Sequence, residues 1–152
     1  MTCPYFMPVS RIEGGNWPHP TRLPLGCGWS GHCTAPGHES QVPPPEILEA
    51  FCNLGYAGNC AWSPLRRNWD AVRFAVLPPT EPAARNGNQA PLDITPARTL
   101  RLVYVCERNH RPVDHGELEF DLTQSTCLRR HDDARIQKMA ECFLESYLKK
   151  KA

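Results

Sequence analysis

Regular alternation of apolar and polar residues is confined to the second half of the chain. It predicts strands over residues 69–77, 99–107 and 117–122. The last two strands are expected to form a hairpin around a turn at residues 108–113, with turn chemistry supplied by Asn109, Pro112 and the following Gly116. A polar segment rich in proline, glycine and asparagine predicts a loop over residues 80–96.

Farther along, apolar residues recur at helical spacing and predict one long helix over residues 132–149. Asp132 or Asp133 is placed to cap it, because a carboxylate accepts hydrogen bonds from the free N–H groups of a first helical turn. A single apolar stripe follows this helix: Ile136, Met139, Ala140, Phe143, Leu144, Tyr147 and Leu148. We expect this stripe to pack on the sheet.

The first half of the chain lacks such a pattern. Prolines interrupt its beginning, and residues 25–31 hold too many glycines for a helix or a central strand. Only residues 45–54 predict a short helix. We therefore expect one domain, residues 1–152, with a loop-rich half over 1–69 and an α+β half over 70–152.

Charge and hydropathy exclude several classes of protein. The chain has 17 basic and 16 acidic residues, a net charge of +1, and no basic stripe of the kind that binds nucleic acid. No apolar run approaches the roughly 20 residues of a membrane span, and the N-terminus lacks a signal-peptide pattern. We therefore expect a cytoplasmic protein, in which clustered cysteines indicate metal binding or thiol chemistry rather than disulfides.

Five of the eight cysteines lie in the first 60 residues, among glycines, prolines and aromatic residues: Cys3, Cys27, Cys33, Cys52 and Cys60. Glycines let a backbone turn closely around a bound group. No CxxC pair, common in structural zinc sites, is present, so the spacing favours an iron–sulfur cluster over zinc or free redox thiols. No function is assigned to Cys106, expected on a strand face, to Cys127, or to Cys142, expected near the polar side of the long helix.

Short motifs spread over most of the chain add to this interpretation. In the first half they are CPYF at 3–6, PLG at 24–26, GHC at 31–33 and CNLGYA at 52–57, followed by Cys60. In the second half they are DAVRF at 70–74, HRPVDHG at 110–116 and RIQKMAECFLESYL at 135–148. With these motifs the chain resembles a family of small, largely uncharacterised bacterial proteins that look like iron–sulfur cluster binders. The resemblance implies a [4Fe–4S] cluster held by Cys3, Cys33, Cys52 and Cys60. Cys27 is the spare candidate, because the family pattern does not require cysteine there.

Histidines offer weaker candidates. His32, next to Cys33, could replace a thiolate ligand, although a loop histidine is the favoured interpretation. His110, Asp114 and His115 near the hairpin turn could form a mononuclear metal site or an acid–base pair, but we favour a solvated turn. No catalytic residue is predicted, because the cysteines and histidines show no nucleophile spacing and no phosphate-binding loop occurs.

Together these observations predict a small antiparallel sheet with a long C-terminal helix and a loop-rich half that wraps a metal cluster. The predicted function is electron transfer or redox sensing by a [4Fe–4S] protein with a redox or other protein partner. One alternative is a structural metal module, with an iron–sulfur cluster or zinc, whose α+β surface binds a protein. Another is an enzyme whose cluster has an open iron that binds substrate.

Overall fold

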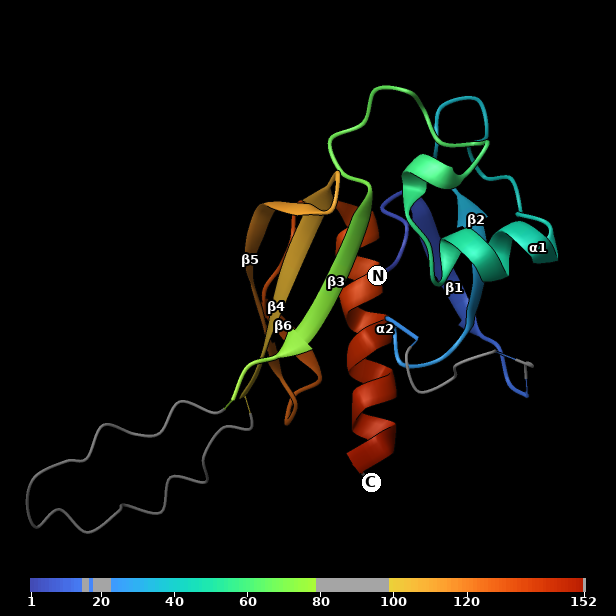
Figure 1. The fold of residues 1–152 in the computed structure, drawn as a ribbon. Coiled ribbons are helices and arrows are strands. Elements are labelled where there is room, and N and C mark those ends of the chain that lie inside the picture. Colours follow the sequence, from blue (N-terminus) through green and yellow to red (C-terminus); the bar gives the residue numbers. More distant parts are fainter. Residues whose placement is uncertain (15–16, 18–22, 79–98, 152) are drawn as a thin grey trace, which may run out of the picture.

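The chain folds into two small antiparallel sheets and a long C-terminal helix (Figure 1). This computed structural model describes residues 1–14, 17, 23–78 and 99–151. The loop predicted at 80–96 lies outside the described residues. The α+β class expected from the sequence is confirmed, but the second sheet was not expected.

The larger sheet has four strands in the order of the sequence: β3 (Ala71–Val76), β4 (Thr99–Arg108), β5 (Arg111–Asp121) and β6 (Thr126–Arg129). The three strands predicted from alternation correspond to β3, β4 and the second part of β5. The hairpin turn is shorter than predicted, because Asn109 and His110 both adopt positive φ, 51° and 61°, and form a two-residue turn. β5 therefore begins at residue 111 rather than at 117, and β6 was not predicted.

The smaller sheet pairs β1 (Phe6–Arg11) with β2 (Trp29–Cys33), where the sequence predicted only loop. Both strands are edge strands, so Pro8 needs no N–H for the pairing. Gly31 lies opposite Pro8, and a Cβ atom at Gly31 would come within 2.0 Å of the carbonyl oxygen of Met7. Gly31 was one of the glycines that made the sequence predict no strand here, yet its lack of a side chain lets the backbones of β1 and β2 approach each other.

The short helix predicted at 45–54 is present but ends earlier. It starts as α1 (Pro45–Ile47) and continues as a wider π-helical turn, η2 (Leu48–Cys52). The N–H of Asn53 donates to the carbonyl of Leu48 at 3.2 Å and closes that turn. A 3-10 turn, η3 (Ala57–Asn59), follows. Cys52 is therefore the last residue of the helical segment.

The long helix is α2 (Ala134–Lys151), and Asp133 caps it by accepting the N–H of Arg135 at 2.9 Å. The helix runs between the two sheets, so it is buried on more than one side (Figure 1). Cys142 and Ser146 are each only 2% exposed, and Cys27 Sγ lies 3.5 Å from Ser146 Oγ. The expectation that Cys142 lies near a polar side is therefore wrong.

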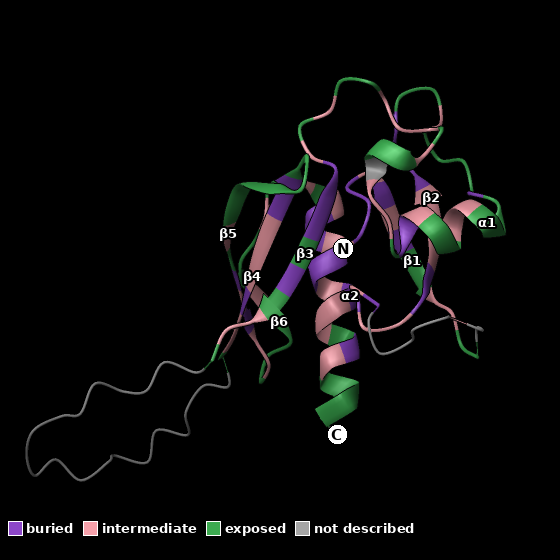
Figure 2. Cartoon of the chain, viewed as in Figure 1, coloured by how far each residue is buried: buried purple, intermediate pink, exposed green. Residues whose placement is uncertain are grey.

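Most of the core lies between α2 and the inner faces of the two sheets (Figure 2). Its largest fully buried apolar side chains are those of Phe6, Leu25, Val72, Leu102, Leu118, Ile136 and Met139. The predicted stripe of α2 thus contributes Ile136 and Met139, which are both 0% exposed. No helix among the described residues combines the length and the apolar character that crossing a membrane would require.

Candidate metal centre

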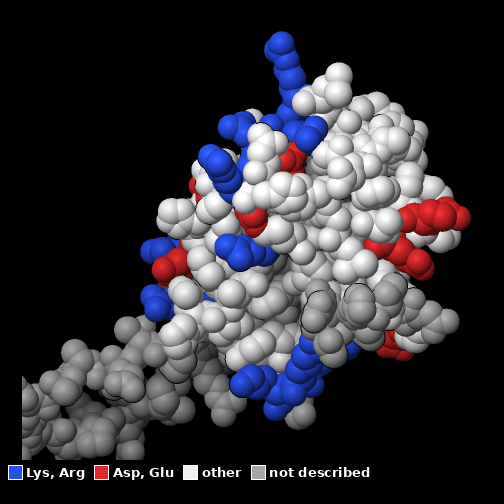
Figure 3. All heavy atoms as spheres, viewed as in Figure 1, with Lys and Arg blue, Asp and Glu red and all other residues white. Residues whose placement is uncertain are grey.

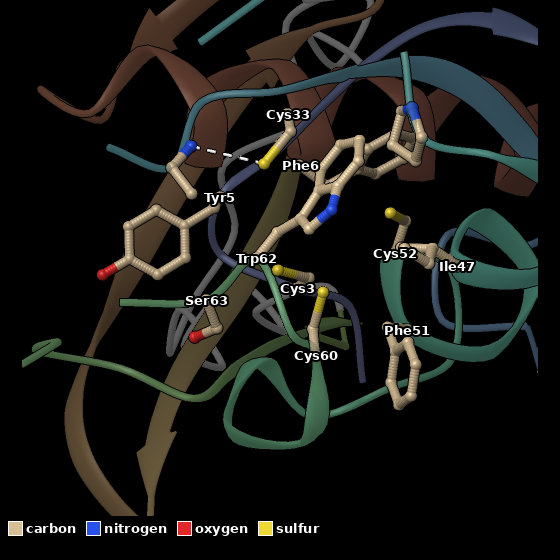
Figure 4. A pocket seen from close by; sticks show the side chains of 12 residues that line it. Cys3, Tyr5, Phe6, Cys33, Ile47, Phe51, Cys52, Cys60, Trp62 and Ser63 are labelled. Atoms are coloured by element: carbon tan, nitrogen blue, oxygen red, sulfur yellow. Dashed lines mark hydrogen bonds between the residues drawn. The ribbon is translucent and has the colours of Figure 1, made fainter. Parts of the chain in front are cut away.

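The four cysteines named by the resemblance line one cavity, although they come from four separate segments (Figure 4). Cys3 and Cys33 are each 8% exposed and Cys52 is 6% exposed, while Cys60 is half-buried. The rest of the lining is largely apolar and aromatic: Tyr5, Phe6, Ala35, Pro43, Ile47, Phe51, Trp62 and Ser63. The sulfur atoms therefore share a space that is mostly shielded from water.

The small sheet brings the first two cysteines together. Cys33 is the last residue of β2 and pairs in register with Phe6, three positions after Cys3. The N–H of Thr34 donates to the carbonyl of Tyr5 at 2.8 Å and extends this pairing past the strand end. The N–H of Ala35 then donates to Cys33 Sγ at 3.3 Å, the bond drawn as a dashed line in Figure 4.

Asn53 fixes the end of η2, and the sequence interpretation gave it no role. Its side chain is buried, accepts the N–H of Trp29 at 2.9 Å and donates to the carbonyl of Trp29 at 3.0 Å. It also donates to the carbonyl of Leu48 at 3.0 Å. The amide thus pairs with β2 much as a neighbouring strand would, and it holds Cys52 beside that strand. Its place within CNLGYA was the only sequence signal.

An ion pair supports the loop that carries Cys60. The guanidinium of Arg67 pairs with Asp70 and donates to the carbonyl of Pro64 at 3.0 Å. A Cβ atom at Gly58 would lie 2.5 Å from Arg67 Nη2, so the guanidinium packs against the chain two residues before Cys60. The sequence interpretation did not single out this pair.

Burial in the cavity favours the protonated form of Cys3, Cys33 and Cys52 by raising their pKa. Burial raises the pKa of Cys3 to about 12, and Cys33 and Cys60 add to the rise because a second negative charge nearby is unfavourable. Burial likewise raises the pKa of Cys52, and the other three cysteines add to it. Negative charge on Cys3 and on Cys52 is therefore mutually unfavourable, and these two thiols can ionise together only if a cation neutralises them.

No known family, no curated protein and no solved structure matches the chain. The resemblance to iron–sulfur proteins therefore rests on the sequence motifs alone.

The residue types around the cavity suit a cluster bound by four thiolates. Backbone N–H groups of Tyr5 and Phe6 act on the thiol of Cys3 and lower its pKa, opposing burial. Ser63 Oγ is buried at the cavity and has no hydrogen-bond partner among the described residues. Such donors stabilise cluster sulfur atoms in iron–sulfur proteins.

The cavity is smaller than an iron–sulfur cluster. Its volume is about 10 Å³, which is roughly that needed by one water molecule. A cluster would therefore require the lining side chains to turn outward, and Cys60 and Trp62, both only half-buried, are best placed to move. Within the described part of the chain, no three His, Cys, Asp or Glu side chains are arranged to hold a single metal ion as they stand.

The other cysteines do not line this cavity. Cys27, the spare candidate, lies against Ser146 of α2 instead. Cys106 is 0% exposed on β4, as a small apolar residue would be. Cys127 lies on β6, where its sulfur donates to the carbonyl of Arg129 at 3.2 Å.

The histidine candidates lie elsewhere as well. His32 is on β2 and is not part of the cavity lining. His110, in the hairpin turn, stacks on Tyr56 with ring centroids 4.4 Å apart. Asp114 and His115 are exposed on β5. These residues form no arrangement suited to a metal ion among those the structure describes.

Proposed function

We propose that the chain binds an iron–sulfur cluster, of the [4Fe–4S] type, through Cys3, Cys33, Cys52 and Cys60. One observation carries the proposal: four cysteines from separate segments line a single, largely buried cavity. We further propose that the cluster serves electron transfer or redox sensing.

A bound cluster supplies a centre that can gain or lose one electron. The chain's own residues have distinct tasks around it. The four thiolates would hold the iron, while the N–H of Ala35, and the hydroxyl of Ser63 once it turns toward the cavity, would stabilise negative charge on sulfur. Aromatic side chains of the lining, the buried Phe6 among them, would keep water away from the sulfur atoms.

The pKa directions favour a metal centre over redox-active free thiols. A thiol that exchanges disulfides or attacks a substrate is usually activated by a lowered pKa. Here burial raises the pKa of Cys3, Cys33 and Cys52, so these thiols are poor nucleophiles without a metal. Iron bound to the thiolates takes the place of their protons and removes the cost of ionising them together.

Metal and sulfide analysis of anaerobically purified protein tests the proposal directly. We expect a brown protein with roughly four irons and four sulfides per chain, and a paramagnetic resonance signal in one oxidation state. A colourless protein that contains one zinc and no sulfide would reject the cluster and favour the structural metal module.

Single replacements test the ligand set. Cys3→Ser, Cys33→Ser, Cys52→Ser and Cys60→Ser should each lower the iron content and bleach the absorbance of the cluster. Cys27→Ser and Cys127→Ser are matched controls, because neither residue lines the cavity, and they should keep the full iron content. Loss of the cluster in Cys27→Ser with retention in Cys33→Ser would overturn the assignment of ligands.

A redox titration separates the proposed roles. A centre that is reduced reversibly within the usual range of biological potentials supports electron transfer or sensing. A cluster that withstands reduction would favour a purely structural role, with the α+β surface left to bind a protein.

A further inference from the structure

A hollow rich in arginine lies beside the cysteine cavity. Its lining consists of Tyr5, Leu65, Arg66, Arg67, Asn68 and Arg108. Its volume is about 420 Å³, and its described lining includes three arginines and no acidic side chain. Figure 3 shows basic side chains at the upper end of this face, near the hairpin turn of β4 and β5, and a second basic group at its lower end.

The hollow and the cavity share a wall. Tyr5 lines both of them. Arg67 connects them a second time, because it lines the hollow and its guanidinium packs beside Gly58 in the loop that carries Cys60. An electron that leaves or reaches the cysteine cavity from this hollow would therefore cross little protein, and electron-transfer rates fall steeply with distance.

The arginines of the hollow have different tasks. Arg67 pairs with Asp70 and supports the fold. Arg66 and Arg108 are exposed and form no ion pair with any described residue. Arg108 also lies directly opposite Arg111 in the strand register. Like charges opposite each other destabilise a sheet, although the charge of Arg108 also helps to lower the pKa of the buried Asp70.

An exposed apolar side chain also lines the hollow. Leu65 is 98% exposed, although it is a large hydrophobic residue. Isolated exposed leucines are common, but an apolar residue that lines the same hollow as three arginines matches the composition of protein interfaces. A small anion would contact the arginines but would not bury Leu65. A protein surface would contact the arginines and also cover Leu65.

We propose that this arginine-rich hollow is the docking surface for an acidic one-electron carrier protein; this inference rests on the proposed cluster. The carrier loses one electron and the cluster gains one, or the reverse, with no bond made or broken and no proton moved. Transient redox complexes are typically small and depend on complementary charge, which fits an open hollow with free arginines.

Binding of a redox-inert acidic carrier tests the proposal without relying on electron transfer. The probe is a gallium-substituted plant-type ferredoxin, added to the cluster-loaded full chain. The double variant Arg66→Glu/Arg108→Glu should raise the Kd at low ionic strength by roughly tenfold or more. Leu65→Ala should raise it by about threefold, and added salt should weaken binding to the parent protein.

The control is Lys149→Glu/Lys150→Glu, which changes the net charge by the same amount. These lysines lie at the C-terminal end of α2, at the opposite end of the molecule from the hairpin turn (Figure 1). The control should change the Kd by less than about twofold, because exposed charges far from a contact are screened. Electron transfer from reduced ferredoxin should follow the same order among the variants.

Four results would overturn the inference. Equal effects of the two double variants would mean that only net charge matters. Displacement of the probe by inorganic phosphate, well beyond chloride at the same ionic strength, would indicate a small-anion site. A loaded chain that fails to bind ferredoxin would reject the docking surface and leave the cluster in place. Absence of the cluster is visible in the absorbance before any binding is measured, and it would reject both proposals.

Discussion

The hydroxyl of Thr2 donates to the carbonyl of Cys52 at 2.7 Å. The same carbonyl accepts the N–H of Cys3 at 3.2 Å. Thr2 also exchanges two backbone hydrogen bonds with Val72, at 2.8 and 2.9 Å, which join the start of the chain to the edge of the large sheet. Two of the four cysteines are thus positioned by bonds that the polypeptide makes without any metal.

Thr2→Val should therefore weaken both the fold and the site. Thr2 is 0% exposed, and valine keeps its shape while removing the hydroxyl donor. The loss of one buried hydrogen bond costs about 1 kcal/mol of the free energy of unfolding, measured by urea titration of the apo protein. The loaded protein should also lose iron to a chelator faster. Thr126→Val, on the exposed β6, is the control, and equal stability of the two variants would contradict this role for Thr2.

Asp70→Asn should loosen the loop that carries Cys60. Burial raises the pKa of Asp70, but the N–H of Asn109 and the guanidinium of Arg67 outweigh this and hold the pKa below its ordinary value of 3.8. The carboxylate thus stabilises the fold above that pH, and this contribution is lost as the pH falls through its lowered folded-state pKa. The variant should lose about 1.5–3 kcal/mol at neutral pH, the range for a charged hydrogen bond.

A urea titration near neutral pH and near pH 3 measures this effect of Asp70. The parent protein should lose more stability on acidification than Asp70→Asn, which lacks the titrating group. Asp114→Asn, an exposed change of the same chemistry on β5, is the control. If chelators removed iron from Asp70→Asn as slowly as from the parent, the proposed support of the Cys60 loop would be wrong.

Alternation and helical spacing were sufficient to predict the elements with a regular apolar stripe or face. β3, β4 and α2 were therefore found close to their true limits. The β1–β2 pair was missed because Pro8 and Gly31 usually break strands, and only their pairing across two edges makes them suitable. Cys142 was misplaced for a related reason: one apolar stripe is visible in the sequence of α2, but the helix packs between two sheets.

The cysteines of the site could be predicted from the sequence, but the residues that hold their segments in place could not. Cysteines in short motifs identified the four side chains that share the cavity. Nothing in the spacing signalled that Asn53 would pair with Trp29, or that Arg67 would brace the loop before Cys60. The Asn53–Trp29 contact joins positions 24 residues apart, and local patterns of polarity carry no information about either contact.

Ser63→Ala separates a structural role from a role at the metal centre. Its hydroxyl is buried without a partner among the described residues, so its loss should leave the apo protein equally stable or slightly more stable. In the loaded protein the hydroxyl would donate to sulfur and favour the more negative, reduced state. Its removal should therefore lower the reduction potential, measured by titration, while Ser30→Ala on β2 leaves the potential unchanged. A clear loss of apo stability would contradict this assignment.

Apo and loaded protein should respond to pH in opposite directions. Because the folded-state pKa of Cys3 is about 12, against an ordinary value of 9.0, the unfolded chain loses this proton first as the pH rises. Apo stability, complete below pH 9, should fall above it by up to about 1.4 kcal/mol per pH unit for each such thiol. Urea titrations under reducing conditions measure this fall, and Cys3→Ser should reduce it. The loaded protein should instead lose iron as the pH falls, because protons compete with iron for the thiolates. An apo stability that rises above pH 9, or stays level in both parent and Cys3→Ser, would mean that these thiols are not buried together.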